Sequence, residues 1–232
     1  RIFLSRIIGA EGLGLYQLIF PIFGLAMSVT AMGIQTAISH YVSGKIALGD
    51  KTGSRKVFFS GVLLSLTLSV LVSMVLFSGA DFLAVHFLKE ERTAELLRYL
   101  SFAVPFASFH SCAIGYFMGQ KKTGIPSVSQ LFEQAVRIFS ALLLHGIFVE
   151  KGIPITPLVA VIAMIAAEFL TSLFTLTLLL LETVAHRASF TLPSFKDILS
   201  VGKMAAPLSG NRLCLSALQS LEAVLIPTRL KL

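Results

Sequence analysis

The sequence predicts an all-α integral membrane protein, built as a polytopic helical bundle. Of its 232 residues, 55% are hydrophobic and only 13% are charged, and the mean hydropathy is +0.85. The apolar residues come in runs of about 20 or more, the length that a helix needs to cross a hydrocarbon core of roughly 30 Å. A signal peptide would give one short apolar block instead of a series. The composition excludes an ordinary soluble domain.

Six membrane spans can be placed in order, separated by short connections rich in Gly, Pro and charge. The first three rest on long uncharged runs at residues 12–44, 57–80 and 99–120. The fourth contains two charges, the fifth only Glu168, and the sixth a mixture of apolar and polar residues. The predicted spans are Leu15–Ser43, Val57–Gly79, Ala94–Gly119, Ser127–Val149, Pro157–Leu181 and Val201–Arg229.

The ends of the chain indicate a fragment of a longer protein. Arg1 takes the place of an initiating Met, the last span is followed at once by the end at Leu232, and Arg1–Gly14 is typical of the exit from an earlier span. Two prolines, Pro105 and Pro207, fall inside spans and are expected to kink them. The small-xxx-small spacing of Gly115 and Gly119 favours close helix packing.

Lysine and arginine are distributed unequally between the alternate connections. One side holds nine of them and the other four, so the positive-inside rule makes the first side cytoplasmic. The nine are Lys45, Lys51, Arg55, Lys56, Lys121, Lys122, Arg187, Lys196 and Lys203; the four are Lys89, Arg92, Arg98 and Lys151. The net charge of +7 is therefore a topology signal, and we expect no nucleic-acid partner.

The fourth span carries Glu133 and Arg137 within an otherwise apolar stretch. A charged side chain at a bilayer centre costs roughly 2.5–3.5 kcal/mol on insertion scales, and each Val, Ile, Leu or Phe returns about 0.3–0.6 kcal/mol. The stretch has twelve such apolar residues, so the two contributions nearly cancel. This span needs neighbouring helices, with its charges turned toward them or toward water.

Polar residues in the last three spans fall on stripes. At 100° per residue, one face of each helix gathers the polar side chains. In the fourth span they are Gln130, Glu133, Gln134, Arg137 and Ser140; in the fifth Glu168, Thr171, Ser172 and Thr175; in the sixth Ser209, Arg212, Ser216 and Gln219, with Glu222 at the edge. Three helices with one polar face each predict a shared polar interior.

Two interpretations of these charges remain open. Glu133 and Arg137, four residues apart, can form a structural ion pair. Alternatively, Arg137 or Arg212 meets an anionic substrate group in a water-filled cavity, and Glu168 relays protons or binds a cation. His110 and His145 are expected to be packed, hydrogen-bonded residues. No metal-ligand spacing accompanies them or the two cysteines, Cys112 and Cys214, so we expect no metal and no cofactor.

Enzyme motifs are absent from the sequence. It has no H-E-x-x-H, G-x-S-x-G, Walker A or G-x-G-x-x-G pattern. Short matches to a penicillin-binding signature, Ser200–Lys203 and two Lys-Thr-Gly triplets, lie in small connections without the Ser-Asp-Asn element and are spurious. We expect a non-enzyme that works without ATP hydrolysis.

Three blocks of sequence resemble a known transporter family: Ser5–Pro21, Glu133–Arg137 and Asn211–Leu230. They are similar to the polysaccharide transporter branch of the multidrug/oligosaccharidyl-lipid/polysaccharide exporters, and most of all to its stage V sporulation protein B group. The match in spacing and span order extends over essentially the whole chain.

The resemblance implies the first lobe of a two-lobe transporter of about 14 helices that moves lipid-linked saccharides by alternating access. Residues 1–232 would supply the end of helix 1 through helix 7, with a second, C-terminal lobe missing. Cationic residues of the family face the phosphate of the lipid-linked substrate. On this basis Arg6 is the first candidate for substrate binding, followed by Arg137, Arg212 and Arg1, with Glu133, Glu168 and Glu222 as structural or coupling charges.

The sequence therefore predicts a flippase in the bacterial plasma membrane for lipid-linked polysaccharide or peptidoglycan precursors. Its partners would be the bilayer, a lipid-linked saccharide with a phosphate headgroup, and the C-terminal lobe. Two alternatives are a cation-coupled multidrug exporter that uses Glu133 or Glu168, and a membrane scaffold of an envelope-synthesis complex without transport of its own.

Overall fold

The computed structural model describes the backbone of residues 2–152, 156–185 and 194–230, and the side chains of residues 8–152, 156–184 and 194–218. All the regular structure in these residues is helical. The elements are α1 (Ile2–Leu18), α2 (Phe20–Met27), the π-helical turn η1 (Ser28–Met32), α3 (Gly33–Ala47), α4 (Lys51–Ser78), α5 (Ala80–Phe82), the π-helical segment η2 (Leu83–Leu88), α6 (Thr93–Ser101), α7 (Ala103–Gly119), α8 (Gly124–Glu150), α9 (Leu158–Ala185) and α10 (Phe195–Leu230).

Most of the predicted spans are present. Among the described residues, four helical stretches are long and apolar enough to cross a membrane, over residues 8–47, 51–78, 124–150 and 158–184, and the bent pair α6–α7 is a fifth candidate. Helix α1 begins at Ile2, before the predicted span start at Leu15. The sixth predicted span is helical throughout as α10, but within the described residues it does not reach the apolarity of the other five.

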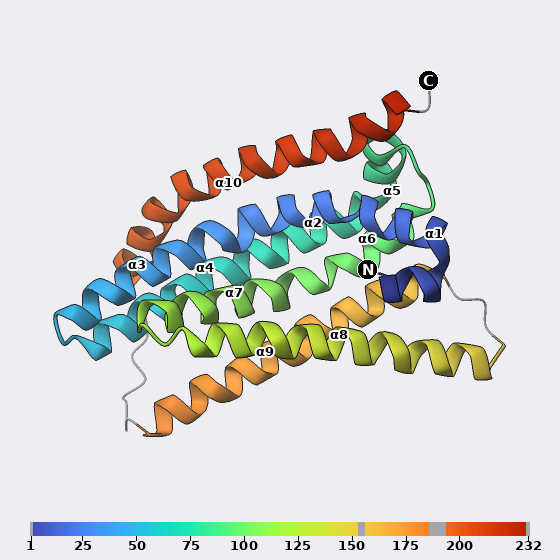
Figure 1. Ribbon diagram of the computed structural model, residues 1–232. Helices are drawn as coiled ribbons and strands as arrows, with labels where there is room; N and C mark the ends of the chain where they lie inside the picture. The colour runs from blue at the N-terminus through green and yellow to red at the C-terminus, as the bar shows by residue number, and fades with distance from the viewer. Residues whose placement is uncertain (1, 153–155, 186–193, 231–232) are drawn as a thin grey trace.

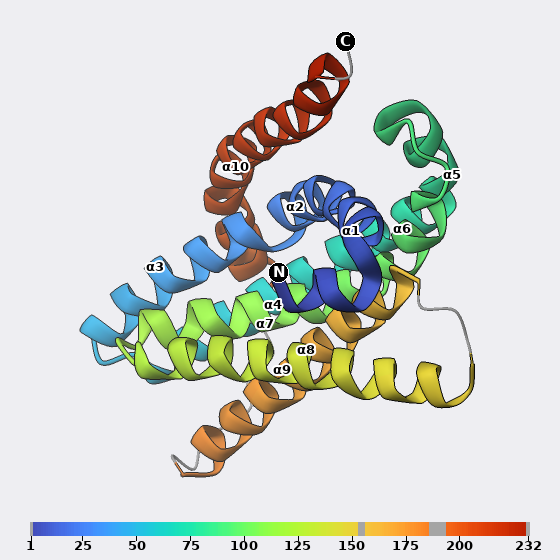
Figure 2. The ribbon, with the colours of Figure 1, turned by 45° about the vertical axis from the view of Figure 1, so that its right-hand side comes forward.

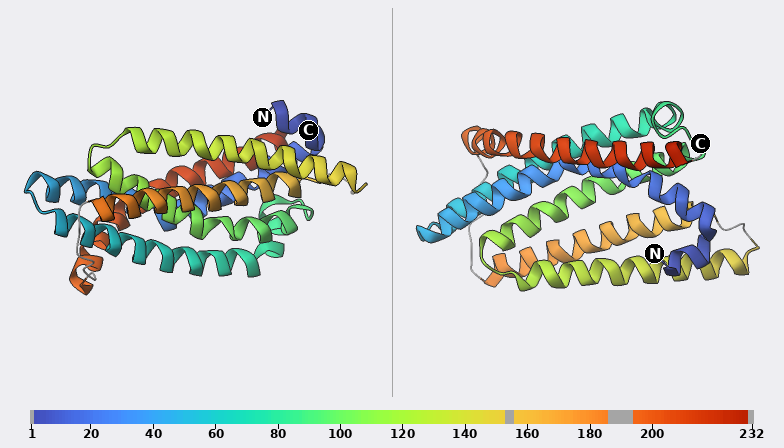
Figure 3. Two further views of the ribbon diagram at one scale, coloured as in Figure 1. Left: turned by 90° about the horizontal axis from the view of Figure 1, so that it is seen from below. Right: turned by 45° about the horizontal axis from the view of Figure 1, so that its top comes forward.

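The long helices lie side by side with their connections at alternate ends. The α3–α4 and α7–α8 turns share one end of the bundle, and η2 and the C-terminal end of α8 lie at the other (Figure 1). In two further views, α8 and α9 lie on one side of α2 and α3, and α10 lies on the other side (Figures 2 and 3). This alternation agrees with the grouping of lysines and arginines used to orient the chain.

Asp50 begins α4 at the end of the bundle predicted to be cytoplasmic. Its Oδ1 accepts a hydrogen bond from the Gly53 N–H (2.7 Å) and its Oδ2 one from Lys45 Nζ (3.1 Å). The Gly53 bond first, and then Lys45, lower the pKa of Asp50 below its ordinary value. A carboxylate whose pKa is lowered by folding stabilises the fold at pH values above its unfolded-state pKa. This contribution is lost as the pH falls through its folded-state pKa.

The α6–α7 bend confirms the kink predicted at Pro105. The two helices meet at 46°, and proline at position 105 cannot donate to the carbonyl of Ser101. Ser73 of α4 supplies the missing donor, because its Oγ lies 2.6 Å from the Ser101 oxygen. The break is therefore stabilised by a neighbouring helix, as proline breaks in membrane helices usually are. At Pro207, α10 continues without an interruption.

We expect Ser73→Ala to destabilise the protein by about 1 kcal/mol, since it leaves the Ser101 carbonyl in the apolar interior without a donor. Thermal unfolding in detergent measures the change. Ser78→Ala is the matched control, because the Ser78 hydroxyl donates only within its own helix, to Met74 and Val75. An equal effect of the two substitutions would contradict this account of the bend.

A second polar contact fixes η1 in the middle of the bundle. A π-helical turn leaves backbone groups out of the regular i→i+4 pattern. Here Ser65 Oγ of α4 donates to the Thr30 carbonyl (2.6 Å), and Ser108 Oγ of α7 donates to Thr30 Oγ1 (2.9 Å). All three side chains are fully buried, so the irregular turn is held from two sides.

Glycines let α7 lie directly on α3, as the small-xxx-small spacing predicted. A Cβ on Gly115 would lie 2.5 Å from the Gln35 carbonyl oxygen, and one on Gly119 would lie 2.8 Å from that of Ser39. On the other side of α3, Gly33 meets α10, where a Cβ would lie 2.7 Å from the Ala205 oxygen. The three helices therefore pack backbone to backbone, which positions α10 against the rest.

Candidate functional site

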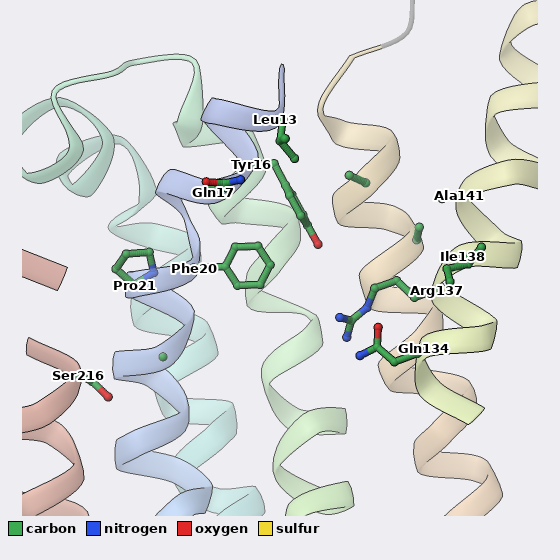
Figure 4. Close-up of a pocket in the computed structure, with 13 residues that line it drawn as sticks. Leu13, Tyr16, Gln17, Phe20, Pro21, Gln134, Arg137, Ile138, Ala141 and Ser216 are labelled. Atoms are coloured by element: carbon green, nitrogen blue, oxygen red, sulfur yellow. The ribbon is translucent and has the colours of Figure 1, made fainter. Parts of the chain in front are cut away.

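A cavity of about 590 Å³ lies between the N-terminal helices and the α8–α9 pair. Its walls come from α1, α2, α8 and α9, with one residue from α10 (Figure 4). The lining residues are Leu13, Tyr16, Gln17, Phe20, Pro21, Gly24, Gln134, Arg137, Ile138, Ala141, Ala160, Ala163 and Ser216. Segments more than 100 residues apart in the sequence thus meet around one space.

Polar and apolar side chains both line the cavity. The Arg137 guanidinium and the Gln134 amide project from α8 toward the side on which the hydroxyl of Tyr16 lies (Figure 4). Phe20 and Pro21 are apolar lining residues. Residues 134, 137, 138 and 141 share a face of α8 because they are separated by helical spacing. The site can thus bind an amphiphile that carries a negative or strongly polar group.

Arg137 also belongs to a cluster of three charges. Its Nη2 donates to Glu133 Oε1 in the same helix, and lies 3.6 Å from Glu168 Oε1 of α9. The side chains of Arg137, Glu133 and Glu168 are only 21%, 15% and 8% exposed. Arg137 Nε is buried without a hydrogen-bond partner among the described residues. The ion pair expected from the i,i+4 spacing is thus present, and Glu168 joins it.

The prediction of one interior shared by three polar stripes holds only in part for α9, because Glu168 joins Arg137 of α8 while the rest of the α9 stripe is buried away from the cavity. Thr171 and Thr175 are fully buried and Ser172 is nearly so, whereas α9 contributes only Ala160 and Ala163 to the cavity. The reason is that α9 packs against both α7 and α8, so its polar stripe is covered. Thr175 Oγ1 bonds back to the carbonyls of Thr171 and Ser172.

The α10 stripe meets the cavity through Ser216 rather than Arg212. Ser216 lines the space, and its Oγ lies 2.7 Å from Ser28 Oγ of η1. Arg212 is exposed, and its backbone oxygen accepts a long bond from Ser28 Oγ (3.5 Å). We find no ion pair for Arg212 among the described residues.

The remaining predicted site residues lie partly outside the described part of the chain. Arg6 is in α1, before the non-helical Gly9 (φ 74°, ψ 171°), and its side chain is outside the described residues, as is that of Glu222 in α10. Arg1 lies outside them altogether. Their roles in substrate binding or coupling stay predictions.

Tyr16 and Gln17 are polar cavity residues that sequence reasoning did not single out as binding residues. Tyr16 is 4% exposed, and its hydroxyl lies 3.9 Å from Met164 Sδ of α9. The signal was a Tyr-Gln pair in an uncharged run of the first span, two polar-tipped residues where aliphatic side chains would insert at lower cost.

The histidines and cysteines of the described residues do not come together as possible metal-ligand groups. Within the described residues, no group of three or more His, Cys, Asp or Glu side chains gathers. The histidines expected to be hydrogen-bonded each have a buried Nδ1 without a partner in the described part of the chain, at His110 and His145. The expected hydrogen bond is therefore absent at Nδ1 of both rings in the described residues. Cys112 is buried and Cys214 exposed, both as free thiols.

Comparison with known proteins places these features in a family. The model of the family described as "Polysaccharide biosynthesis protein" matches residues 1–231. The chain is 30% identical to stage V sporulation protein B of Bacillus subtilis (strain 168), over 75% of this chain and 34% of that protein. It is 28% identical to the lipid II flippase MurJ of the same organism, over 58% of this chain and 26% of that protein.

Two solved structures share the fold. One is an inward-facing multidrug resistance MATE family transporter of the MOP superfamily (TM-score 0.73, 21% identity, 89% of this chain and 47% of that one). The other is a MOP superfamily transporter from Pyrococcus furiosus whose binding pocket is described as reversed in polarity (TM-score 0.74, 22% identity, 93% and 48%). The chain thus spans about half the length of these transporters and about a third or less of the Bacillus relatives.

The resemblance predicted from Ser5–Pro21, Glu133–Arg137 and Asn211–Leu230 is confirmed, because the family match extends over residues 1–231. The chain belongs to the polysaccharide biosynthesis protein family and is a multi-pass membrane protein.

Proposed function

We propose that this chain is the N-terminal lobe of a flippase that moves lipid-linked polysaccharide or peptidoglycan precursors across a bacterial plasma membrane. The cavity beside Arg137 receives the phosphate-bearing headgroup, and a C-terminal lobe completes the site. Rocking of the two lobes around the bound headgroup then exposes it to each side in turn.

The observation that carries this proposal is the mixed polar and apolar lining of the cavity. A lipid-linked saccharide combines an anionic phosphate, sugar hydroxyls and an apolar chain. Arg137 offers N–H donors to the phosphate, while Gln134 and Gln17 offer amides and Tyr16 a ring face to the sugars. Phe20, Ile138 and the alanines form the apolar part of the same space. Membership of the polysaccharide biosynthesis family and similarity to a lipid II flippase support this substrate class.

A flipping assay with the full-length protein in proteoliposomes tests the proposal. We expect Arg6→Ala and the double variant Glu133→Gln/Arg137→Gln to reduce flipping of a lipid-linked saccharide at least tenfold, with Arg212→Ala weaker. The double variant removes one charge of each sign, so the balance of buried charge is kept. Lys121→Ala, exposed in the turn between α7 and α8, is the control. Unchanged flipping in all three variants would exclude the cationic headgroup site.

A cation-coupled drug exporter is the second candidate, favoured by the buried carboxylate of Glu168 and by the MATE-like fold. Loss of drug efflux in Glu168→Gln, with envelope synthesis intact, would support it over the flippase. The scaffold interpretation has a separate signature: transport-inactive variants of the cavity would still rescue a deletion strain.

A further inference from the structure

Arg137 serves two sets of partners at once, and this creates an electrostatic conflict. It lines the cavity, yet it also pairs with Glu133 and lies 3.6 Å from Glu168. With one guanidinium and two carboxylates, the ionised cluster has a net charge of −1. An anionic headgroup that enters the cavity would therefore meet a cation whose charge is already more than balanced. In a poorly hydrated site this repulsion is strong.

We propose that Glu168 is a proton-binding site linked to the headgroup, and that it takes up one proton when an anion binds to Arg137. This inference rests on the proposed function and deepens it. The Glu168 carboxylate gains a proton from water and becomes a neutral acid, while an oxygen of the anion accepts N–H bonds from Arg137. One negative charge enters and one is neutralised, so the net charge of the site does not change.

The geometry selects Glu168 over Glu133 as the proton acceptor. Glu133 receives a direct hydrogen bond from the Arg137 Nη2, whereas the 3.6 Å separation of Glu168 is beyond hydrogen-bond length. Glu168 is also the more buried of the two. Because Arg137 has five N–H donors and its buried Nε is unpartnered, it can keep Glu133 and still bind an anion.

The groups that face Glu168 leave Arg137 as its cationic partner in the described part of the chain. From α8 they are Glu133 and Arg137, and from α1 the Tyr16 hydroxyl, which interacts electrostatically with both Arg137 and Glu168. The α7 helix brings His110, with no hydrogen bond or ion pair to Glu168.

The remaining neighbour of α9 is α6, whose charged residues belong to the end of the bundle. Arg98 of α6 pairs there with Asp81 (2.5 Å), and Glu95 lies one turn before it. These groups therefore provide no further cation for Glu168 when an anion engages Arg137, and protonation is the available means of neutralising it.

The test is calorimetric binding of farnesyl pyrophosphate to the full-length protein in detergent, between pH 5.5 and 8.5, in buffers of differing ionisation enthalpy. The probe's own titration is common to every variant and cancels in comparisons. We expect wild-type protein to take up close to one proton per probe more than Glu168→Gln does. The affinity of the wild-type protein for the probe should fall as the pH rises. This fall should be steeper than that of Glu168→Gln by up to tenfold per pH unit. Glu182→Gln, in the same helix but paired with Lys122, is the matched control and should retain the wild-type pH dependence.

Equal proton uptake in wild-type and Glu168→Gln protein would overturn the inference while leaving the headgroup site intact. An affinity that depends on sodium at constant pH would overturn it in favour of a metal cation. Absence of probe binding at every pH would instead refute the proposed function. If Glu168→Gln does not fold, the number of protons that wild-type protein takes up per bound probe is the test. A number no higher than the probe's own titration accounts for contradicts the proposal.

Discussion

Replacing Arg137 alone by leucine is expected to destabilise the protein by about 3–5 kcal/mol, whereas replacing Glu133 and Arg137 together by leucine should cost clearly less than the sum of the single changes. Removing one partner of a buried pair strands the other in a poorly hydrated place, but removing both leaves apolar side chains. Arg137→Leu strands two carboxylates, because Glu168 also faces the guanidinium.

Chemical unfolding of the two single variants and the double variant gives the coupling energy between the side chains. Gln130→Leu is the control, since Gln130 is exposed on α8 one turn before Glu133. Additive effects of the two leucine substitutions would contradict a structural unit. The double variant also separates the two interpretations of the pair. If it is stable but does not flip the saccharide, Arg137 has a role in transport beyond holding α8 to α9.

The second large effect is expected at the α3–α7 crossing. Gly115→Leu should destabilise the protein by about 3 kcal/mol or prevent its folding, because a side chain there would push α7 away from the Gln35 backbone. Packing between small residues is a main source of helix association in membranes, so little else would compensate for the separation.

Thermal stability and expression of the folded protein in detergent measure this effect. Gly146→Leu is the matched control, since a Cβ added at Gly146 of α8 would meet nothing within 4 Å. This replacement should change stability by less than about 0.5 kcal/mol. Similar losses in the two variants would show that the crossing does not depend on the contact at Gly115.

The single-helix features of this protein were determined by sequence. Uncharged runs gave the spans, since only a continuous apolar stretch crosses a bilayer. Pro105 gave a break through its missing N–H, and Gly115 and Gly119 gave a close contact through their missing side chains. The i,i+4 spacing of Glu133 and Arg137 brought these side chains together because both lie on one helix. Each of these follows from local geometry.

The assignment of each helix face to a partner came from the tertiary structure alone. The stripes on α8, α9 and α10 follow the same helical periodicity in sequence, yet Arg137 of α8 lines the cavity, Arg212 of α10 is exposed, and the α9 stripe is covered by α7 and α8. Tyr16 reaches the same space from a helix more than 100 residues earlier. Periodicity fixes the direction of a side chain around its own helix axis, but the neighbour it meets depends on packing between helices distant in sequence, which no local pattern encodes.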